Sequence, residues 1–112
     1  MTKEFIPYEQ ALALKELGFD EPCLATYHKE LNTIIPIYAK YTNQDVLKAP
    51  LYQQAFRWFR EKGYDVKVQK ESDGLYFGFY WTGAAWIIVG NGTYEQAELA
   101  CLIILIEIVK TK

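Results

Sequence analysis

The sequence has little of what catalytic and metal centres are built from. It contains one histidine, His28, and two cysteines, Cys23 and Cys101, which lie far apart in the chain. One histidine without closely spaced cysteines does not build a common zinc site. A lone histidine also matches no template for acid–base catalysis. We therefore expect no catalytic residues, no metal and no cofactor.

Long apolar runs and a disulfide framework are also missing. The longest apolar stretch near the C-terminus, 99–106, is much shorter than the roughly 20 residues that span a bilayer. The first residues are mixed polar and lack the apolar core of a secretory signal. Two cysteines without ligand spacing are typical of reduced thiols in a cytosolic protein. We therefore expect a cytoplasmic protein that does not bind membranes.

Net charge is low but unevenly distributed. The 112 residues carry a net charge of −2, which is too near neutral to indicate a polyanionic partner. Residues 48–70 carry six basic and two acidic side chains, a net of +4, whereas residues 71–109 carry five acidic and no basic ones, a net of −5. The simple interpretation is ordinary solvated faces. The sharper one is a molecule with a basic and an acidic end, suited to a charged partner.

Signals for helix ends are clear. Pro7 and Gly18 suit the first turn and the C′ position of one helix. Thr93 and Gln96 have the spacing of a capping box, in which each side chain accepts a hydrogen bond from the other residue's backbone. With the apolar stripes, these signals predict helices over 8–17, 50–62 and 94–110.

Strand signals and turns complete the fold prediction. Strands are predicted over 23–28, 34–41, 64–70, 75–81 and 84–89, with an irregular segment over 42–48. Pro36 cannot donate to a ladder, so its strand should be an edge. The fold class is α+β, in the order α-β-β-α-β-β-β-α, with a mainly antiparallel sheet and the helices packed on one face. We expect a single domain, 1–112, in which segment 1–47 packs on a unit formed by 48–112.

The strand 75–81 is almost wholly aromatic. Its alternation divides the side chains into two sets, namely Leu75, Phe77, Phe79 and Trp81 on one face and Tyr76, Gly78 and Tyr80 on the other. We expect the first set to pack under the helices. The Tyr76 and Tyr80 face resembles a base-stacking platform. We expect the N-terminal segment to cover it, with ligand stacking as the alternative.

The final helix is apolar around its whole circumference, although a helix on a sheet needs only about a third of it apolar. Its core stripe should comprise Ala97, Cys101, Ile104 or Leu105, and Ile108. The remaining apolar residues should face outward, centred on Leu99, Ile103 and Ile106. We expect these three to form the interface of a homodimer or higher oligomer, since a two-fold pairing is the simplest closed solution.

Residues 49–110 show the order helix, three antiparallel strands, helix, and residues 90–100 form a glycine-rich turn followed by an alanine-bearing helix start. In both respects this part resembles a double-stranded-RNA-binding domain, which implies that family's topology. The family's last helix opens with a lysine cluster for phosphates, but Glu95 and Glu98 stand there in this chain. No RNA contact is therefore carried over from that cluster. A nucleic-acid site would instead use the basic residues Arg57, Arg60, Lys67 and Lys70.

Three stretches, 7–23, 49–62 and 94–102, resemble a family of small uncharacterised proteins of bacteriophages and bacterial mobile elements. The resemblance implies expression in the cytoplasm of a bacterial host cell and brings no known activity. The function we expect is a non-catalytic protein-interaction or assembly module of phage type, with an unknown protein partner. A nucleic-acid-binding module is the alternative.

Overall fold

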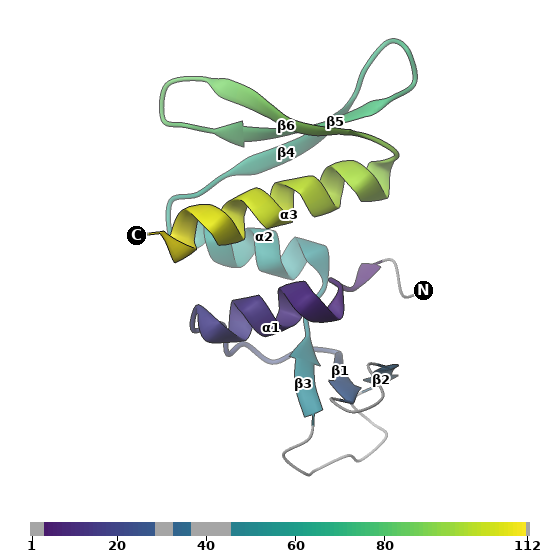
Figure 1. Cartoon of the computed structure of the whole chain (residues 1–112), viewed down its shortest axis with the longest axis vertical. Coiled ribbons are helices and arrows are strands. Elements are labelled where there is room, and N and C mark those ends of the chain that lie inside the picture. Colours follow the sequence, from purple (N-terminus) through teal and green to yellow (C-terminus); the bar gives the residue numbers. More distant parts are fainter. Residues whose placement is uncertain (1–3, 29–32, 37–45, 112) are drawn as a thin grey trace. The chain divides into compact units, whose positions relative to one another are not determined.

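The computed structural model describes residues 4–28, 33–36 and 46–111. In chain order, its elements are α1 (Tyr8–Glu16), β1 (Ala25–His28), β2 (Thr33–Pro36), β3 (Val46–Ala49), α2 (Tyr52–Glu61), β4 (Val66–Lys70), β5 (Tyr76–Trp81), β6 (Trp86–Gly92) and α3 (Tyr94–Lys110) (Figure 1). Every strand pairing is antiparallel, which confirms the α+β class. The predicted succession of elements is present with one further strand, β3, which begins in the segment expected to be irregular, 42–48, and ends one residue beyond it. The predicted continuation of the second strand beyond Pro36 lies outside the described residues.

The chain divides into two compact units, residues 1–52 and residues 53–112, which are described separately. In the N-terminal unit the strand order is β2-β1-β3. The strand that ends at Pro36 is therefore an edge, as its missing N–H predicted. The unit's core includes Ile6, Leu14 and Tyr27, and the Tyr27 hydroxyl donates to the Ile6 carbonyl at 2.6 Å.

The signals for helix ends are confirmed. Gly18 follows α1 with φ of +103°, a conformation that favours glycine. At the start of α3, the Thr93 hydroxyl accepts from the Gln96 N–H at 3.1 Å, and the Gln96 side-chain oxygen accepts from the Thr93 N–H at 2.9 Å. Two backbone donors that lack helical partners are thereby satisfied.

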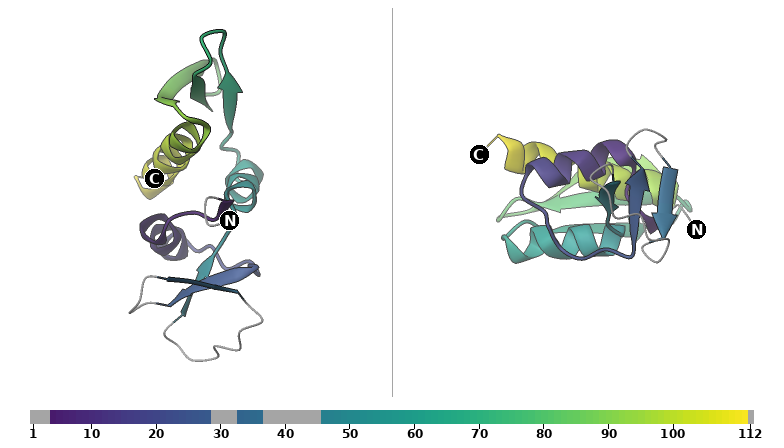
Figure 2. Two further views of the ribbon diagram at one scale, coloured as in Figure 1. Left: turned by 90° about the vertical axis from the view of Figure 1, so that its right-hand side faces the viewer. Right: turned by 90° about the horizontal axis from the view of Figure 1, so that it is seen from below.

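The C-terminal unit is a three-stranded sheet, ordered β4-β5-β6, with both helices on one face. In Figure 2, α2 lies beneath β4, and α3 lies beneath β5 and β6. This confirms for this unit the prediction that helices cover one face. Its order, α-β-β-β-α, is the one that the resemblance to the RNA-binding domain implied, while the family relationship itself stays a prediction.

Strand β6 is longer than predicted. Gly90 was expected to end it, yet the strand continues to Gly92. The register passes from Phe79↔Ile88 to Gly78↔Gly90, so Val89 is an extra residue in a β-bulge. A bulge bends the strand, and pairing resumes beyond it.

Candidate functional site

The face of β5 that lies against α3 is identified by Gly78. A Cβ atom at this position would lie 2.7 Å from the Cys101 Sγ and 2.8 Å from the Ala97 carbonyl oxygen. A Cβ at Gly90 of β6 would likewise collide with the side chain of Ala100. Two glycines of the sheet therefore face small residues of α3, and this allows the helix and sheet backbones to approach closely.

The prediction for the two faces of β5 was wrong. Tyr76 lies on the same face as Gly78, and its ring meets Tyr94 of α3 edge-on, with 5.4 Å between centroids. The side chains of Phe77, Phe79 and Trp81 therefore lie on the opposite face. The small residues of α3 need glycine opposite them, so the larger aromatic set cannot occupy the helix side. The face that we expected the N-terminal segment to cover contacts α3 instead.

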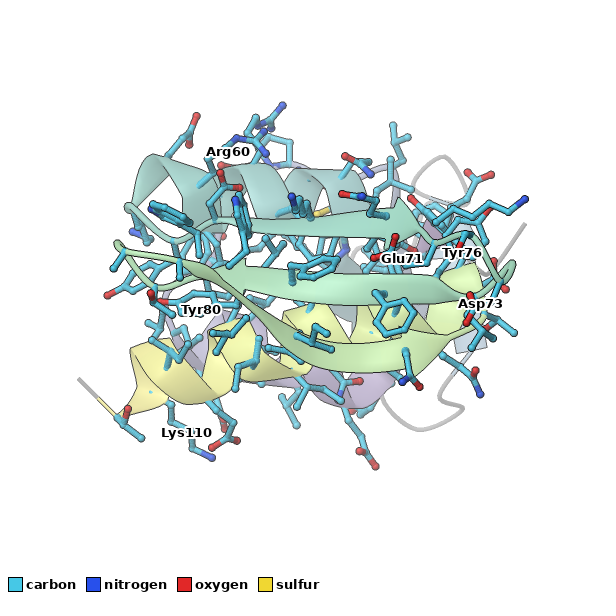
Figure 3. The ribbon with its side chains drawn as sticks, turned by 90° about the horizontal axis from the view of Figure 1, so that it is seen from above. Arg60, Glu71, Asp73, Tyr76, Tyr80 and Lys110 are labelled. Atoms are coloured by element: carbon cyan, nitrogen blue, oxygen red, sulfur yellow. The ribbon has the colours of Figure 1, made fainter. Side chains whose placement is uncertain are left out.

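The large side chains turned away from the helices form a continuous group, which we call the aromatic face. Figure 3 looks onto it, with the helices behind the sheet. It comprises Lys67 of β4, Phe77, Phe79 and Trp81 of β5, and Trp86 and Ile88 of β6. The rings of Phe77 and Phe79 stack at 6.4 Å, and those of Trp81 and Trp86 lie 5.3 Å apart. No described element of the C-terminal unit covers this face.

Exposure on the aromatic face is high for side chains of this type. Trp81 and Trp86 are each 37% exposed, and Ile88 is 59% exposed. Single exposed apolar residues are common on protein surfaces, but contiguous groups mark interaction sites. Tryptophan is also among the residues that contribute most binding energy in interfaces.

Lys67 places a positive charge over these rings. Its Nζ lies 4.5 Å from the centroid of the Trp86 ring and 5.3 Å from that of Phe79. Both distances are within the range of cation–π attraction. The ammonium group is held at the centre of an apolar surface, where water is a weaker competitor for a carboxylate than in bulk solution.

The basic residues predicted for nucleic-acid contact are not gathered on this face. Arg57 and Arg60 are exposed on α2, where Figure 3 shows Arg60 beyond β4, at the edge of the unit. Arg60 and Lys67 line one groove between α2 and β4. Lys70 is exposed at the far end of β4, paired with Tyr76. Arg60 and Lys67 thus line one groove, but the Lys67 ammonium itself lies over Phe79 and Trp86 on the aromatic face. The structure therefore does not gather the charges of Arg60, Lys67 and Lys70 at one place.

The residues predicted for an oligomer interface differ in exposure. Ile103 is 43% exposed, Leu99 is half-buried, and Ile106 is 6% exposed. Of the three, only Ile103 lies fully on the surface. The predicted core stripe of α3 is confirmed at Ala97, Cys101 and Leu105, which are all fully buried. Ile108 is only half-buried, and the prediction that Ile106 faces outward was wrong, because this side chain belongs to the core.

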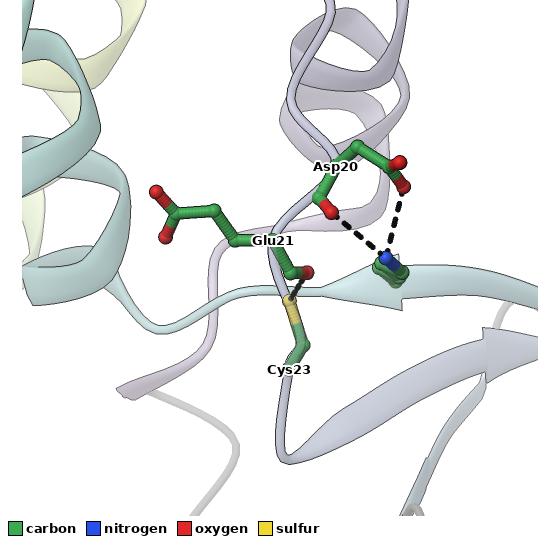
Figure 4. Close-up of polar contacts among 4 residues, drawn as sticks. Asp20, Glu21 and Cys23 are labelled. Atoms are coloured by element: carbon green, nitrogen blue, oxygen red, sulfur yellow. Dashed lines mark hydrogen bonds and ion pairs between the residues drawn. The ribbon is translucent and has the colours of Figure 1, made fainter.

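Two polar contacts in the N-terminal unit involve titratable groups, Lys48 with Asp20 and the Cys23 thiol. Lys48 Nζ donates to the Asp20 side chain at 2.9 Å and to its backbone carbonyl at 3.1 Å (Figure 4). This hydrogen bond from Lys48 lowers the pKa of Asp20. The Cys23 thiol donates to the Glu21 carbonyl oxygen, and desolvation raises its pKa to about 11. A thiol with so high a pKa is a poor nucleophile near neutral pH.

Comparisons with known proteins add no relatives. No family model, no curated protein and no solved structure matches the chain. Over the described residues, no three metal-ligating side chains gather in one place. None of the helices described is both long and apolar enough to cross a bilayer.

The sequence reasoning missed Trp86 and Ile88 as site residues. Their strand was predicted, but nothing in its own pattern distinguishes the side under α3 from the free side. The available signal was the glycine in β5 together with alanine and cysteine four residues apart in the last helix, namely Gly78, Ala97 and Cys101. A glycine inside a strand often marks close approach of another backbone.

Proposed function

We propose that this chain is a non-catalytic protein-interaction module and that the aromatic face of the C-terminal unit is its binding surface. The observation that carries the proposal is the pair of exposed tryptophans, Trp81 and Trp86, whose rings lie in contact, with the Lys67 ammonium over the Trp86 ring. The partner is a protein segment with apolar side chains and at least one carboxylate. The apolar side chains cover the rings, and the carboxylate pairs with Lys67.

Charge favours a protein partner over nucleic acid. Lys67 is the one basic side chain of the aromatic face among the described residues, and residues 71–109 contain no lysine or arginine. Binding to a phosphate backbone depends on several such contacts, each of which releases counterions. A single lysine among aromatic rings is better suited to one carboxylate within an apolar contact.

The proposal is tested by selection from a displayed library of random peptides. We expect enriched peptides to combine aromatic or aliphatic residues with Asp or Glu. Their affinity should fall at least about tenfold for both Trp86→Ser and Lys67→Glu, because residues at the centre of an interface contribute most of its binding energy.

Lys62→Glu is the matched control for this selection. Lys62 follows the last residue of α2, and its Nζ also lies over a tryptophan ring, 4.6 Å from the centroid of Trp58 of α2, away from the aromatic face. Peptide affinity should be unchanged in this variant. Failure to enrich any peptide, or binding that survives Trp86→Ser, would refute the proposed function.

The alternative function, binding of single-stranded nucleic acid, is favoured by one specific observation. Exposed aromatic rings on an antiparallel sheet, with a lysine beside them, are the elements on which bases stack in single-strand-binding proteins. Submicromolar binding of an oligothymidine at physiological salt, lost in Trp86→Ser and with a steep salt dependence, would support this function instead.

The remaining parts of the proposal come from the sequence. The resemblance to bacteriophage and mobile-element proteins supports an assembly role in the cytoplasm of a bacterial host. The apolar circumference of α3 supports a homodimer or higher oligomer, with Ile103 as the exposed member of the predicted interface.

A further inference from the structure

The free edge of β6 has unusual chemistry for an exposed strand. Exposed edge strands of soluble proteins are normally protected by charged residues, proline or a covering element. The sequence from Thr82 to Tyr94 contains no charged residue and no proline. Apolar side chains are exposed on both sides of the strand, since Ile88 lies on the aromatic face and Ile87 lies on the helix side, where it is 46% exposed.

The backbone of this edge is oriented for pairing. Hydrogen-bonded and non-hydrogen-bonded pairs alternate along an antiparallel ladder. The Thr82 N–H donates to the Ala85 carbonyl, and the Trp81 N–H donates to Asp65 on the β4 side. The alternation therefore directs the amide groups of Ile87 toward β5 and those of Trp86 and Ile88 away from the sheet.

We propose that a second copy of the chain pairs with this edge, β6 against β6 in antiparallel orientation, to form a continuous six-stranded sheet. The two-fold axis passes through Ile87. Trp86 of each copy pairs with Ile88 of the other, and each such pair exchanges both of its backbone hydrogen bonds. Ile87 meets Ile87 of its copy at the closer spacing of a non-hydrogen-bonded pair. Such an interface is isologous and closed.

Charge identifies a second copy as the occupant. The edge contains no charge to repel an identical strand. The other edge of the sheet, β4, carries Lys67 and Lys70, so pairing β4 with its own copy would bring like charges together. An uncharged, apolar strand can pair with an identical strand without charge repulsion.

A strand edge alone is smaller than a standard interface, which buries about 800 Å² per partner, and α3 supplies further area. This helix lies beneath β5 and β6, so the strand spacing of about 4.8 Å brings the two copies of α3 to roughly the 8–10 Å at which helices pack. The contact of Ala100 with Gly90 places Ala100 beneath β6. Ile103 and Ile104 lie three and four residues further along α3, on neighbouring positions of that flank.

The first test is sedimentation of the native protein and of Ile87→Lys. We expect the native protein to be a dimer at tens of micromolar. The dissociation constant of the dimer should be at least roughly tenfold higher in the variant, because two lysines would meet on the axis. Leu24→Lys is the control: it makes the same change at an apolar residue that is 66% exposed in the N-terminal unit, and it should remain dimeric. Lys67→Glu should also remain dimeric, which separates this inference from the proposed function.

The second test fixes the register and needs no destabilising charge. In a Cys23→Ser background, Ile87→Cys should form a disulfide-linked dimer on mild oxidation, because its Cα atoms would be about 4.5 Å apart, within disulfide range. In an Ile88→Cys variant the new thiol faces Trp86 of the other copy, so the two copies should not be cross-linked through this position. A monomeric native protein, equal cross-linking of the two variants, or a dimer that Ile103→Glu dissociates but Ile87→Lys does not would overturn the inference.

Discussion

Glu98 is a carboxyl group removed from water near the start of α3. It is 6% exposed, and desolvation is the main cause of its raised pKa, with the charge of Glu95 adding to the effect. A hydrogen bond from Tyr94 acts in the opposite direction, because it favours the ionised form. The folded state therefore holds a proton on Glu98 more strongly than the unfolded state does.

The pH dependence that follows has a defined sign. Between the ordinary value of 4.5 and the raised folded-state pKa, the folded protein binds more protons than the unfolded chain, so Glu98's contribution to stability falls as pH rises. We expect Glu98→Gln to melt at a higher temperature than the native protein at pH 7, and the difference to shrink as pH approaches 4.5. Glu95→Gln removes the same charge from an exposed position; it should stabilise less, because it relieves only the repulsion that Glu95 exerts on Glu98 and leaves the desolvation of Glu98 in place. Thermal unfolding of the three proteins from pH 4 to pH 8 is the measurement, and a lower melting temperature for Glu98→Gln at pH 7 would contradict the argument.

At the scale of elements, the contact between α3 and the sheet determines which surface is left free. Gly78 and Gly90 face the small residues Ala97, Ala100 and Cys101 across this contact. The helix approaches the sheet closely because at these two positions the sheet contributes no side chain and the helix contributes only small ones. Phe77, Phe79 and Trp81 of β5 and Trp86 and Ile88 of β6 lie on the opposite face, where they form the aromatic face.

Gly78→Ala tests this contact directly. The added methyl would lie 2.8 Å from the Ala97 carbonyl oxygen, and a backbone atom moves only if the helix moves. We expect a loss of about 1–3 kcal/mol in the free energy of unfolding, as is typical of overpacking, measured by urea denaturation. Adding Cys101→Ala removes the sulfur atom from the collision but leaves the carbonyl in place. The double variant should therefore show a smaller loss than the two single changes added together. Strictly additive losses would show that Gly78 and Cys101 do not meet.

At the scale of the whole molecule, the sequence separates basic from acidic segments. Residues 48–70 have a net charge of +4 and residues 71–109 a net charge of −5. The start of α3 carries Glu95 and Glu98. A double-stranded-RNA-binding domain, which this part of the chain resembles, has lysines there. This distribution gives no continuous basic surface along the final helix.

We therefore expect double-stranded RNA to bind no more tightly than about 1 µM at physiological salt, which is the tight end of non-specific binding. A mobility-shift assay with a duplex of mixed sequence is the measurement, with Arg57→Ala and Arg60→Ala as variants and Glu61→Gln as the control on the same helix. Submicromolar binding that weakens in both arginine variants would establish the nucleic-acid alternative.

Local chemistry made most of the fold predictable. Glycine and proline at the ends of α1, and the Thr93–Gln96 capping box, act within a few residues, so the sequence alone locates these helix ends. The short strand β3 was missed because its apolar pattern is brief and follows a polar segment, and pairing with β1 is what makes it a strand. The continuation of β6 past Gly90 was missed for a related reason, since a bulge depends on the neighbouring strand.

The sequence by itself determined the α+β class, the antiparallel hairpins, the caps, and the burial of Ala97, Cys101 and Leu105 on α3. Each of these follows from the identity and spacing of nearby residues. Only the tertiary structure decided which face of β5 is free, because alternation divides a strand into two faces without saying which one a helix will cover. The steric fit between Gly78 and the small residues of α3 made that choice. It turned Phe79, Trp81 and Trp86 outward, while the strand order β4-β5-β6 left the uncharged strand β6 at an edge.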